Sequence, residues 1–86
     1  MTERELLERV KEGINVYGDT LDGTLTIYIT EIKEFMKDAG VPETFFNEIA
    51  SVGIVTKGVR DLYFDGSLSD YFYKRLYQLK LEVANV

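Results

Sequence analysis

The sequence predicts an all-α protein: a single small domain of four main helices plus a short helical turn, packed as a compact helical bundle. Apolar residues recur at three- and four-residue steps along most of the 86 residues, which is the spacing of amphipathic helices. Turn-forming residues separate these runs, and neither a linker nor an internal repeat divides the chain. Because each apolar face is narrow, the helices must pack on one another around one core. We therefore expect residues 1–86 to form one domain.

The first helix is expected over about residues 3–12. Thr2 and Glu5 have the spacing of a capping box, in which the threonine oxygen accepts a backbone N–H and the glutamate reaches back. Gly13 is expected to end the helix. The apolar residues at helical spacing are Leu6, Leu7, Val10 and Ile14.

The second helix has the longest and most regular pattern. We expect Asp19 to cap it by accepting backbone N–H groups, with Asp22 in the first turn near the positive end of the helix dipole. Gly40 is expected to end it in the left-handed conformation, and Pro42 follows. The run LTIYIT inside it is rich in β-branched residues, but the longer helical period outweighs this strand signal. The apolar face consists of Leu21, Leu25, Tyr28, Ile29, Ile32, Phe35 and Met36.

The second half of the chain predicts one short and two longer helical elements. Residues 42–50 suit one or two helical turns, and a third helix is expected from about Ser51 to Phe64. Residues 65–67 form a turn by composition, after which Ser69 caps the last helix. The third helix has an apolar stripe of Val52, Val55, Val59 and Leu62, widened by Ile54 and Tyr63. The last helix has Phe72, Leu76, Leu79 and Val83 on one face, with Tyr73, Tyr77 and Leu81 nearby.

The net charge of −5 comes entirely from the first half of the chain. Residues 1–43 contain ten acidic and five basic residues, whereas residues 44–86 contain five of each. Non-specific nucleic-acid binding is disfavoured, because phosphate contacts need local positive charge. The excess acid is typical of a solvated face that keeps a protein soluble, or of a face that orients subunits in an assembly.

The chain contains no cysteine and no histidine. This composition excludes disulfides, thiol nucleophiles, zinc sites and histidine-based acid–base chemistry. The N-terminus lacks the apolar core of a signal peptide, and no run approaches transmembrane length. We therefore expect no membrane span and a chain that starts life in a cytoplasm.

The stretch GDTLDGT, residues 18–24, has the acids and glycines of a calcium loop. With Gly23 at loop position six, Gly18 falls at position one and Ile29 at position twelve, where an EF-hand needs oxygen ligands. The alternative alignment, with Gly18 at position six, fails in the same way. We therefore expect no metal here and a helix start instead.

The stretch GIVTKGVR, residues 53–60, has the glycine spacing of a phosphate loop. Val59 and Arg60 stand where that loop needs lysine and then serine or threonine, and no strand precedes it. Glycine in a helix costs about 1 kcal/mol relative to alanine. We therefore expect Gly53 and Gly58 to allow close packing of the backbone.

One cluster of basic residues lies in the second half of the chain: Lys57, Arg60, Lys74, Arg75 and Lys80. DNA recognition needs more excess charge than this, or a recognisable helix-turn-helix. Ion pairing with Asp61, Asp70 and Glu82 is the favoured role for these residues.

Aromatic residues also concentrate in the second half, which contains eight of the eleven. Tyr71, Phe72 and Tyr73 are consecutive on the last helix, so they point in three directions and cannot all face one small core. Tyrosine is enriched at protein interfaces, because it joins an apolar body to a polar tip. Our candidate interface residues are Phe45, Phe46, Tyr63, Phe64, Tyr71, Tyr73 and Tyr77.

Several stretches have a familiar order and spacing. After a short N-terminal helix, Gly18-Asp19 leads into YITEIKEFMKDAGV (residues 28–41), followed by SVGIVTKGVRDLYFDG (51–66) and LSDYFYKRLYQL (68–79). In the order and spacing of these stretches, which cover most of the chain, the sequence resembles the small helical head–tail connector (head-completion) proteins of tailed bacteriophages. It departs from them at Tyr63, where tryptophan is common, at Asp70, where proline is common, and in a shorter turn at residues 65–67.

The resemblance implies a structural protein of the virion, located at the head–tail junction and in the host cytoplasm during assembly. Its partners would be copies of itself in a ring, dodecameric on the portal, together with the portal protein and a downstream connector or tail protein. The resemblance implies no catalysis and no cofactor, and DNA would pass through the channel without specific binding. Two alternatives stay open: a small phage-encoded regulatory or adaptor module that binds one protein partner, and a DNA-binding regulator, which the charge disfavours.

Overall fold

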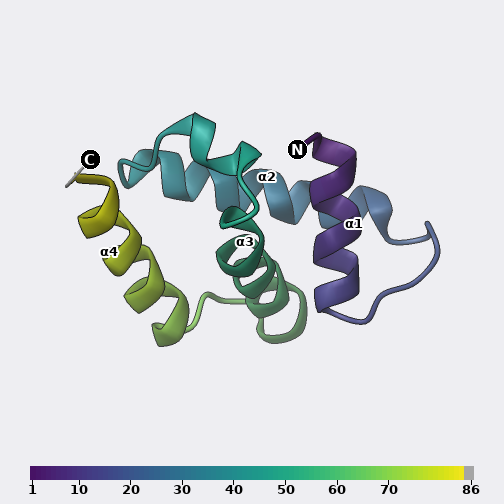
Figure 1. The fold of residues 1–86 in the computed structure, drawn as a ribbon. Coiled ribbons are helices and arrows are strands. Elements are labelled where there is room, and N and C mark those ends of the chain that lie inside the picture. The colour runs from purple at the N-terminus through teal and green to yellow at the C-terminus, as the bar shows by residue number, and fades with distance from the viewer. Residues whose placement is uncertain (85–86) are drawn as a thin grey trace.

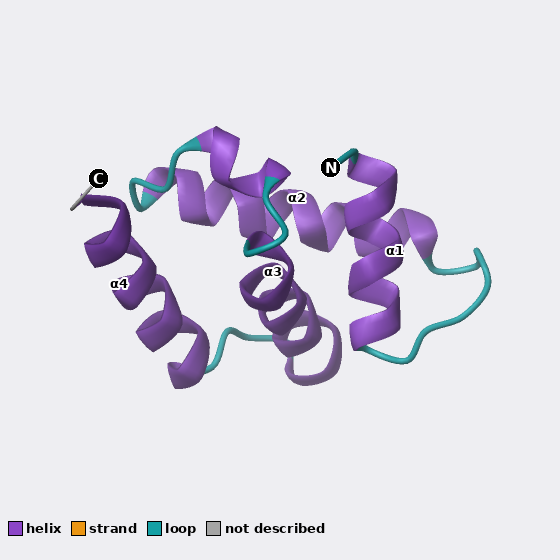
Figure 2. Ribbon diagram, in the orientation of Figure 1, coloured by secondary structure: helices purple, strands orange, loops and turns teal. Residues whose placement is uncertain are grey.

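The computed structural model describes residues 1–84, and these residues form helices and connecting turns with no strand, as Figure 1 and Figure 2 show. The predicted all-α class is confirmed. The elements are α1 (Glu3–Gly13), α2 (Asp22–Asp38), the 3-10 turn η1 (Glu43–Asn47), α3 (Ser51–Arg60), the π-helical turn η2 (Asp61–Asp65) and α4 (Asp70–Ala84).

α3 is the packing centre of the molecule. It contacts α1, α2, α4 and η1, and it lies between α1 and α4 (Figure 1). The molecule is elongated, with principal extents of 40 × 27 × 18 Å. The buried apolar side chains of the core are Leu6, Leu7, Val10, Ile14, Leu25, Ile29, Ile32, Met36, Val41, Phe45, Phe46, Ile54, Val55, Val59, Phe72 and Leu76. The predicted core position Val83 has a side chain outside the described part of the structure.

Glycine allows three helices to meet at Gly58. A Cβ at this position would lie 2.7 Å from Ile32 Cδ1 on α2 and 2.9 Å from Phe72 Cε2 on α4. The expected close packing is therefore confirmed at Gly58. At Gly53 the expectation is wrong, because no atom of the described residues lies within 4 Å of a Cβ built there.

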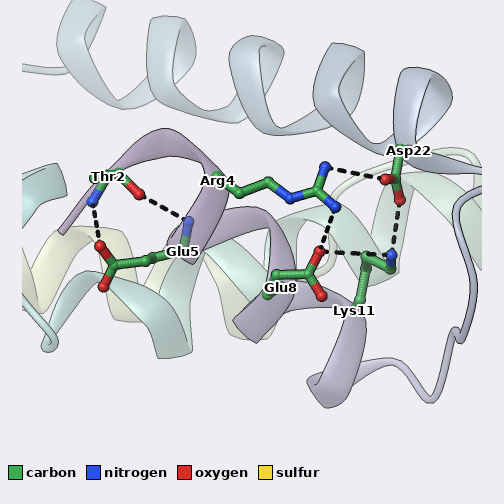
Figure 3. Close-up of polar contacts among 6 residues, drawn as sticks. All are labelled: Thr2, Arg4, Glu5, Glu8, Lys11 and Asp22. Carbon is green, nitrogen blue, oxygen red and sulfur yellow. Dashed lines mark hydrogen bonds and ion pairs between the residues drawn. The ribbon is translucent and has the colours of Figure 1, made fainter.

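α1 begins with the predicted capping box, which Figure 3 shows. The Glu5 backbone N–H donates to Thr2 Oγ1 (3.1 Å), and the Thr2 N–H donates to Glu5 Oε1 (3.3 Å). Gly13 is the last residue of α1, but it is not the residue in the left-handed conformation. That residue is Asn15, two positions later, with φ of 57°. The role of Gly13 is packing, since a Cβ there would lie 2.5 Å from Thr56 Cγ2 on α3.

The predicted cap at the start of α2 is wrong. Leu21 occupies the N-cap position with no side-chain cap, and Asp19 contributes its backbone oxygen, which accepts the Asp22 N–H at 3.1 Å. The predicted end is confirmed: Gly40 has φ of 102°, and its N–H donates to the Lys37 oxygen at 2.9 Å.

The predicted helix from Ser51 to Phe64 is helical to Asp65, but its last turn widens into the π-helical η2. Gly66 ends this turn in the left-handed conformation, with φ of 75°. Ser69 caps α4 as predicted, because its Oγ accepts the Phe72 N–H at 3.2 Å. Two candidate interface residues, Tyr63 and Phe64, therefore lie on η2.

Candidate protein-interaction surface

Of the two acids in the GDTLDGT stretch, Asp22 is held by cations of α1 (Figure 3). Asp22 pairs with Lys11 Nζ at 2.8 Å and with Arg4 at 3.3 Å, and Glu8 contacts the same two cations. The hydrogen bond from Lys11 lowers the pKa of Asp22, although partial burial opposes the shift. Residues 1–84 contain no group of three side chains suited to hold a metal ion. This part of the chain connects α1 to the start of α2.

A second polar cluster joins the end of α3 to the start of α4. The buried Asp61 carboxylate accepts from Lys57 Nζ (2.9 Å), from Ser69 Oγ (2.7 Å) and from the Ser69 N–H (3.0 Å). Burial raises the pKa of Asp61, but the hydrogen bonds from Ser69 and Lys57 outweigh it, so the pKa lies below its ordinary value. A carboxylate with a lowered pKa is a poor general base, and the serine hydroxyl already caps α4. The arrangement is suited to holding the two helices together.

The structure divides the seven candidate interface residues into three groups: buried, half-buried and exposed. Phe45 and Phe46 are core side chains with 8% and 5% exposure, so they are not available on the surface of the subunit. Tyr63 is half-buried, with its ring edge against Tyr28 at a centroid distance of 6.4 Å. The exposed members are Phe64, Tyr71, Tyr73 and Tyr77.

Three large exposed side chains of α4 form a row along its outer side. Tyr73, Tyr77 and Leu81 follow one another at four-residue spacing and are 47%, 62% and 49% exposed. Residues four apart are neighbours on a helix surface. We call these three residues the outer ridge of α4. Contiguous exposed apolar surface on a small protein commonly marks a site of protein interaction.

The ridge borders α2 through Phe35. The Tyr73 ring stands edge-on to the Phe35 ring at a centroid distance of 5.8 Å, and Phe35 is itself partly exposed. As predicted, the three consecutive aromatics of α4 diverge: Phe72 is buried, whereas Tyr71 and Tyr73 are exposed on different sides. Sequence reasoning placed Phe35 in the core, and its partial exposure at the edge of the ridge was not foreseen.

Three of the five basic residues of the second half, Lys74, Arg75 and Lys80, lie on α4 itself. Of the three expected acidic partners, only Asp61 forms an ion pair within residues 1–84, with Lys57; Asp70 and Glu82 do not. Lys74 and Lys80 are exposed and have no ion pair in the described part of the chain.

An open polar groove lies between α3 and α4. Its volume is about 490 Å³, and its lining residues are Gly53, Ile54, Lys57, Tyr71, Arg75 and Gln78. Lys57 lies 5.8 Å from the centroid of the Tyr71 ring, and Arg75 donates to Gln78 at 2.9 Å. The cations of this groove therefore already have partners within the chain.

No helix in residues 1–84 combines the length and the apolar character needed to cross a bilayer. No family model, curated protein or solved structure matches this chain. The functional interpretation therefore depends on the chemistry of the surface, in which exposed tyrosines gather on α4 with lysines that form no ion pair in the described residues.

Proposed function

We propose that this protein is a structural subunit of a phage head–tail connector, which assembles with copies of itself into a ring under the portal and helps to join the DNA-filled head to the tail. In this role the protein binds the portal protein and a downstream connector or tail protein, and it lies at the head–tail junction of the virion. This role requires no catalysis, no cofactor and no specific contact with DNA.

The outer ridge of α4 is the observation that carries this proposal. Tyr73, Tyr77 and Leu81 are about half exposed or more in the isolated chain, which is typical of side chains that a partner covers. The likeness of the sequence to connector proteins supports a partner that belongs to the same assembly.

Native mass spectrometry of the purified protein over a concentration series tests the proposal. We expect discrete ring-sized assemblies to replace the monomer as the concentration rises. A chain that stays strictly monomeric at every concentration would contradict a self-assembling subunit. That result would favour the regulatory or adaptor module, which would use the same ridge for one different protein.

A further inference from the structure

We propose that the outer ridge of α4 packs against the outer face of α2 in a second copy of this chain, with lysines of α4 opposite carboxylates of α2. This inference rests on the proposed self-assembly, and it identifies the two surfaces that form each contact between subunits.

The outer face of α2 consists of Ile27, Glu31, Glu34 and Asp38. All four are exposed, and the helical period places them opposite the buried Leu25, Ile32 and Met36. Ile27 is 67% exposed and gives this face an apolar contact point. Glu34 pairs with Lys37 at 3.2 Å, whereas Glu31 and Asp38 have no ion pair within residues 1–84.

The ridge of α4 has the opposite charge. Lys74 and Lys80 flank Tyr77, one on each side, and both are exposed. Asp70, the first residue of α4, is the one acid at the N-terminal end of the ridge, so the ridge is basic along its middle. Unlike charges on facing surfaces steer two proteins together and select their relative position.

The spacing of the charges on the two helices also agrees. Lys74 and Lys80 are six residues apart, which is about 9 Å along a helix at 1.5 Å per residue. Glu31 and Asp38 are seven residues apart, which is about 10.5 Å. With the two helices antiparallel, Lys80 lies level with Glu31 and Lys74 with Asp38, and the long lysine side chains reach the facing helix from either side of Tyr77. In this register Ile27 lies at the Leu81 end of the ridge and supplies the apolar part of the contact there.

A second copy is the partner that these surfaces fit, because one chain carries both halves of the contact on two different helices. Each subunit can then offer its α4 ridge to one neighbour and its α2 face to another. Such head-to-tail contacts generate a ring when the rotation between subunits closes.

Charge reversal on each surface tests the inference. One variant carries Lys74→Glu and Lys80→Glu, and the other carries Glu31→Lys and Asp38→Lys. We expect each variant alone to need a concentration at least about tenfold higher than the wild type for half-assembly, because like charges then face each other. An equimolar mixture of the two variants should assemble like the wild type, since every contact in an alternating assembly again joins unlike charges.

A matched control carries Arg9→Glu and Glu12→Lys on α1, where both residues are exposed and without an ion pair in the described chain. It should assemble like the wild type. Circular dichroism establishes that every variant keeps its helices, and sedimentation velocity measures assembly.

The outcomes separate this inference from the proposed function. If the wild type assembles and each charge-reversed variant assembles equally well, the assigned surfaces are wrong, but the proposed ring is not contradicted. The same conclusion follows if mixing the two variants does not restore assembly. If the mixture restores only a dimer, the surfaces are right and the ring is contradicted. A wild type that never self-associates overturns both.

Discussion

The buried carboxylate of Asp61 connects the end of α3 to the start of α4. It accepts hydrogen bonds from both the hydroxyl and the backbone N–H of Ser69, and it pairs with Lys57. Removing this carboxylate leaves a backbone donor and a partly buried cation without their acceptor. The loss of a buried acceptor lowers the free energy of unfolding, because its former donors stay desolvated in the folded state without a partner.

We expect Asp61→Ala to lower the free energy of unfolding by about 3 kcal/mol at neutral pH, measured by urea denaturation. Because folding lowers the pKa of Asp61, its contribution is present above the ordinary value of about 3.9 and is lost as the pH falls through the folded-state pKa. The stability difference between wild type and variant should therefore narrow in acid. Asp65→Ala, at an exposed position of the same turn, is the control and should have little effect.

Gly58 and Gly53 provide a matched pair of substitutions on α3. In Gly58→Ala the new methyl group meets Ile32 and Phe72, so we expect the free energy of unfolding to fall by about 2 kcal/mol. In Gly53→Ala the methyl group meets nothing, and we expect a gain of up to about 1 kcal/mol from helix propensity. Equal effects of the two substitutions in thermal or urea unfolding would show that Gly58 does not mark a close approach.

For single residues, rules that depend on a few neighbouring positions gave correct predictions. Thr2, Gly40 and Ser69 have the predicted roles because a cap depends on its immediate neighbours. The pairing of Lys11 with Asp22 was not foreseen, because it depends on how α1 packs beside the start of α2. That packing also gives Asp22 a cationic partner, while Asp19, the predicted cap, stays exposed in the loop.

Among the elements, α4 is the one whose exposed side does not resemble an ordinary solvated face. Its outer ridge exposes two tyrosines and a leucine, whereas its inner side buries Phe72 and Leu76. α4 packs chiefly against α3, and the side chains of the ridge stay about half exposed or more.

We expect the double change Tyr73→Ser and Tyr77→Ser to weaken assembly more than folding. Tyr77 is mostly exposed, and the edge-on contact of Tyr73 with Phe35 contributes about 1 kcal/mol. Sedimentation velocity measures assembly, and thermal melting followed by circular dichroism measures folding. Tyr17→Ser, at an 81% exposed position in the loop before α2, is the control for removing a surface tyrosine. A loss of helical content with unchanged oligomerisation would contradict a role of the two tyrosines in assembly.

Helix positions were predictable because the apolar period and the caps agree over long segments. The strand-like run LTIYIT lies inside α2, where the helical period of the flanking residues decides its structure. The short η1 was harder, because one helical turn does not reveal which of its sides faces the core. Phe45 and Phe46 were therefore assigned to an interface although both are buried. The π-helical form of η2 has no local sequence signal.

For the whole molecule, the all-α class and the single core follow from the amphipathic pattern of the sequence. The pattern shows which side of each helix is buried, but it does not show which helix covers that side. The central place of α3 could therefore not be predicted, and neither could the separation of α1 and α4 on either side of it (Figure 1).

The central place of α3 has a consequence for hydrogen exchange. α3 is contacted by α1, α2, α4 and η1, so its amide protons can exchange only when most of the core opens. We expect their protection to approach the global free energy of unfolding, while amides of α4, which packs on one side, exchange through smaller openings. Mass spectrometry of exchange in the unassembled subunit measures this order, and equal protection of the two helices would contradict it. Motion within a subunit would then be concentrated at its α4 end, and the rest of the bundle would behave as one rigid unit.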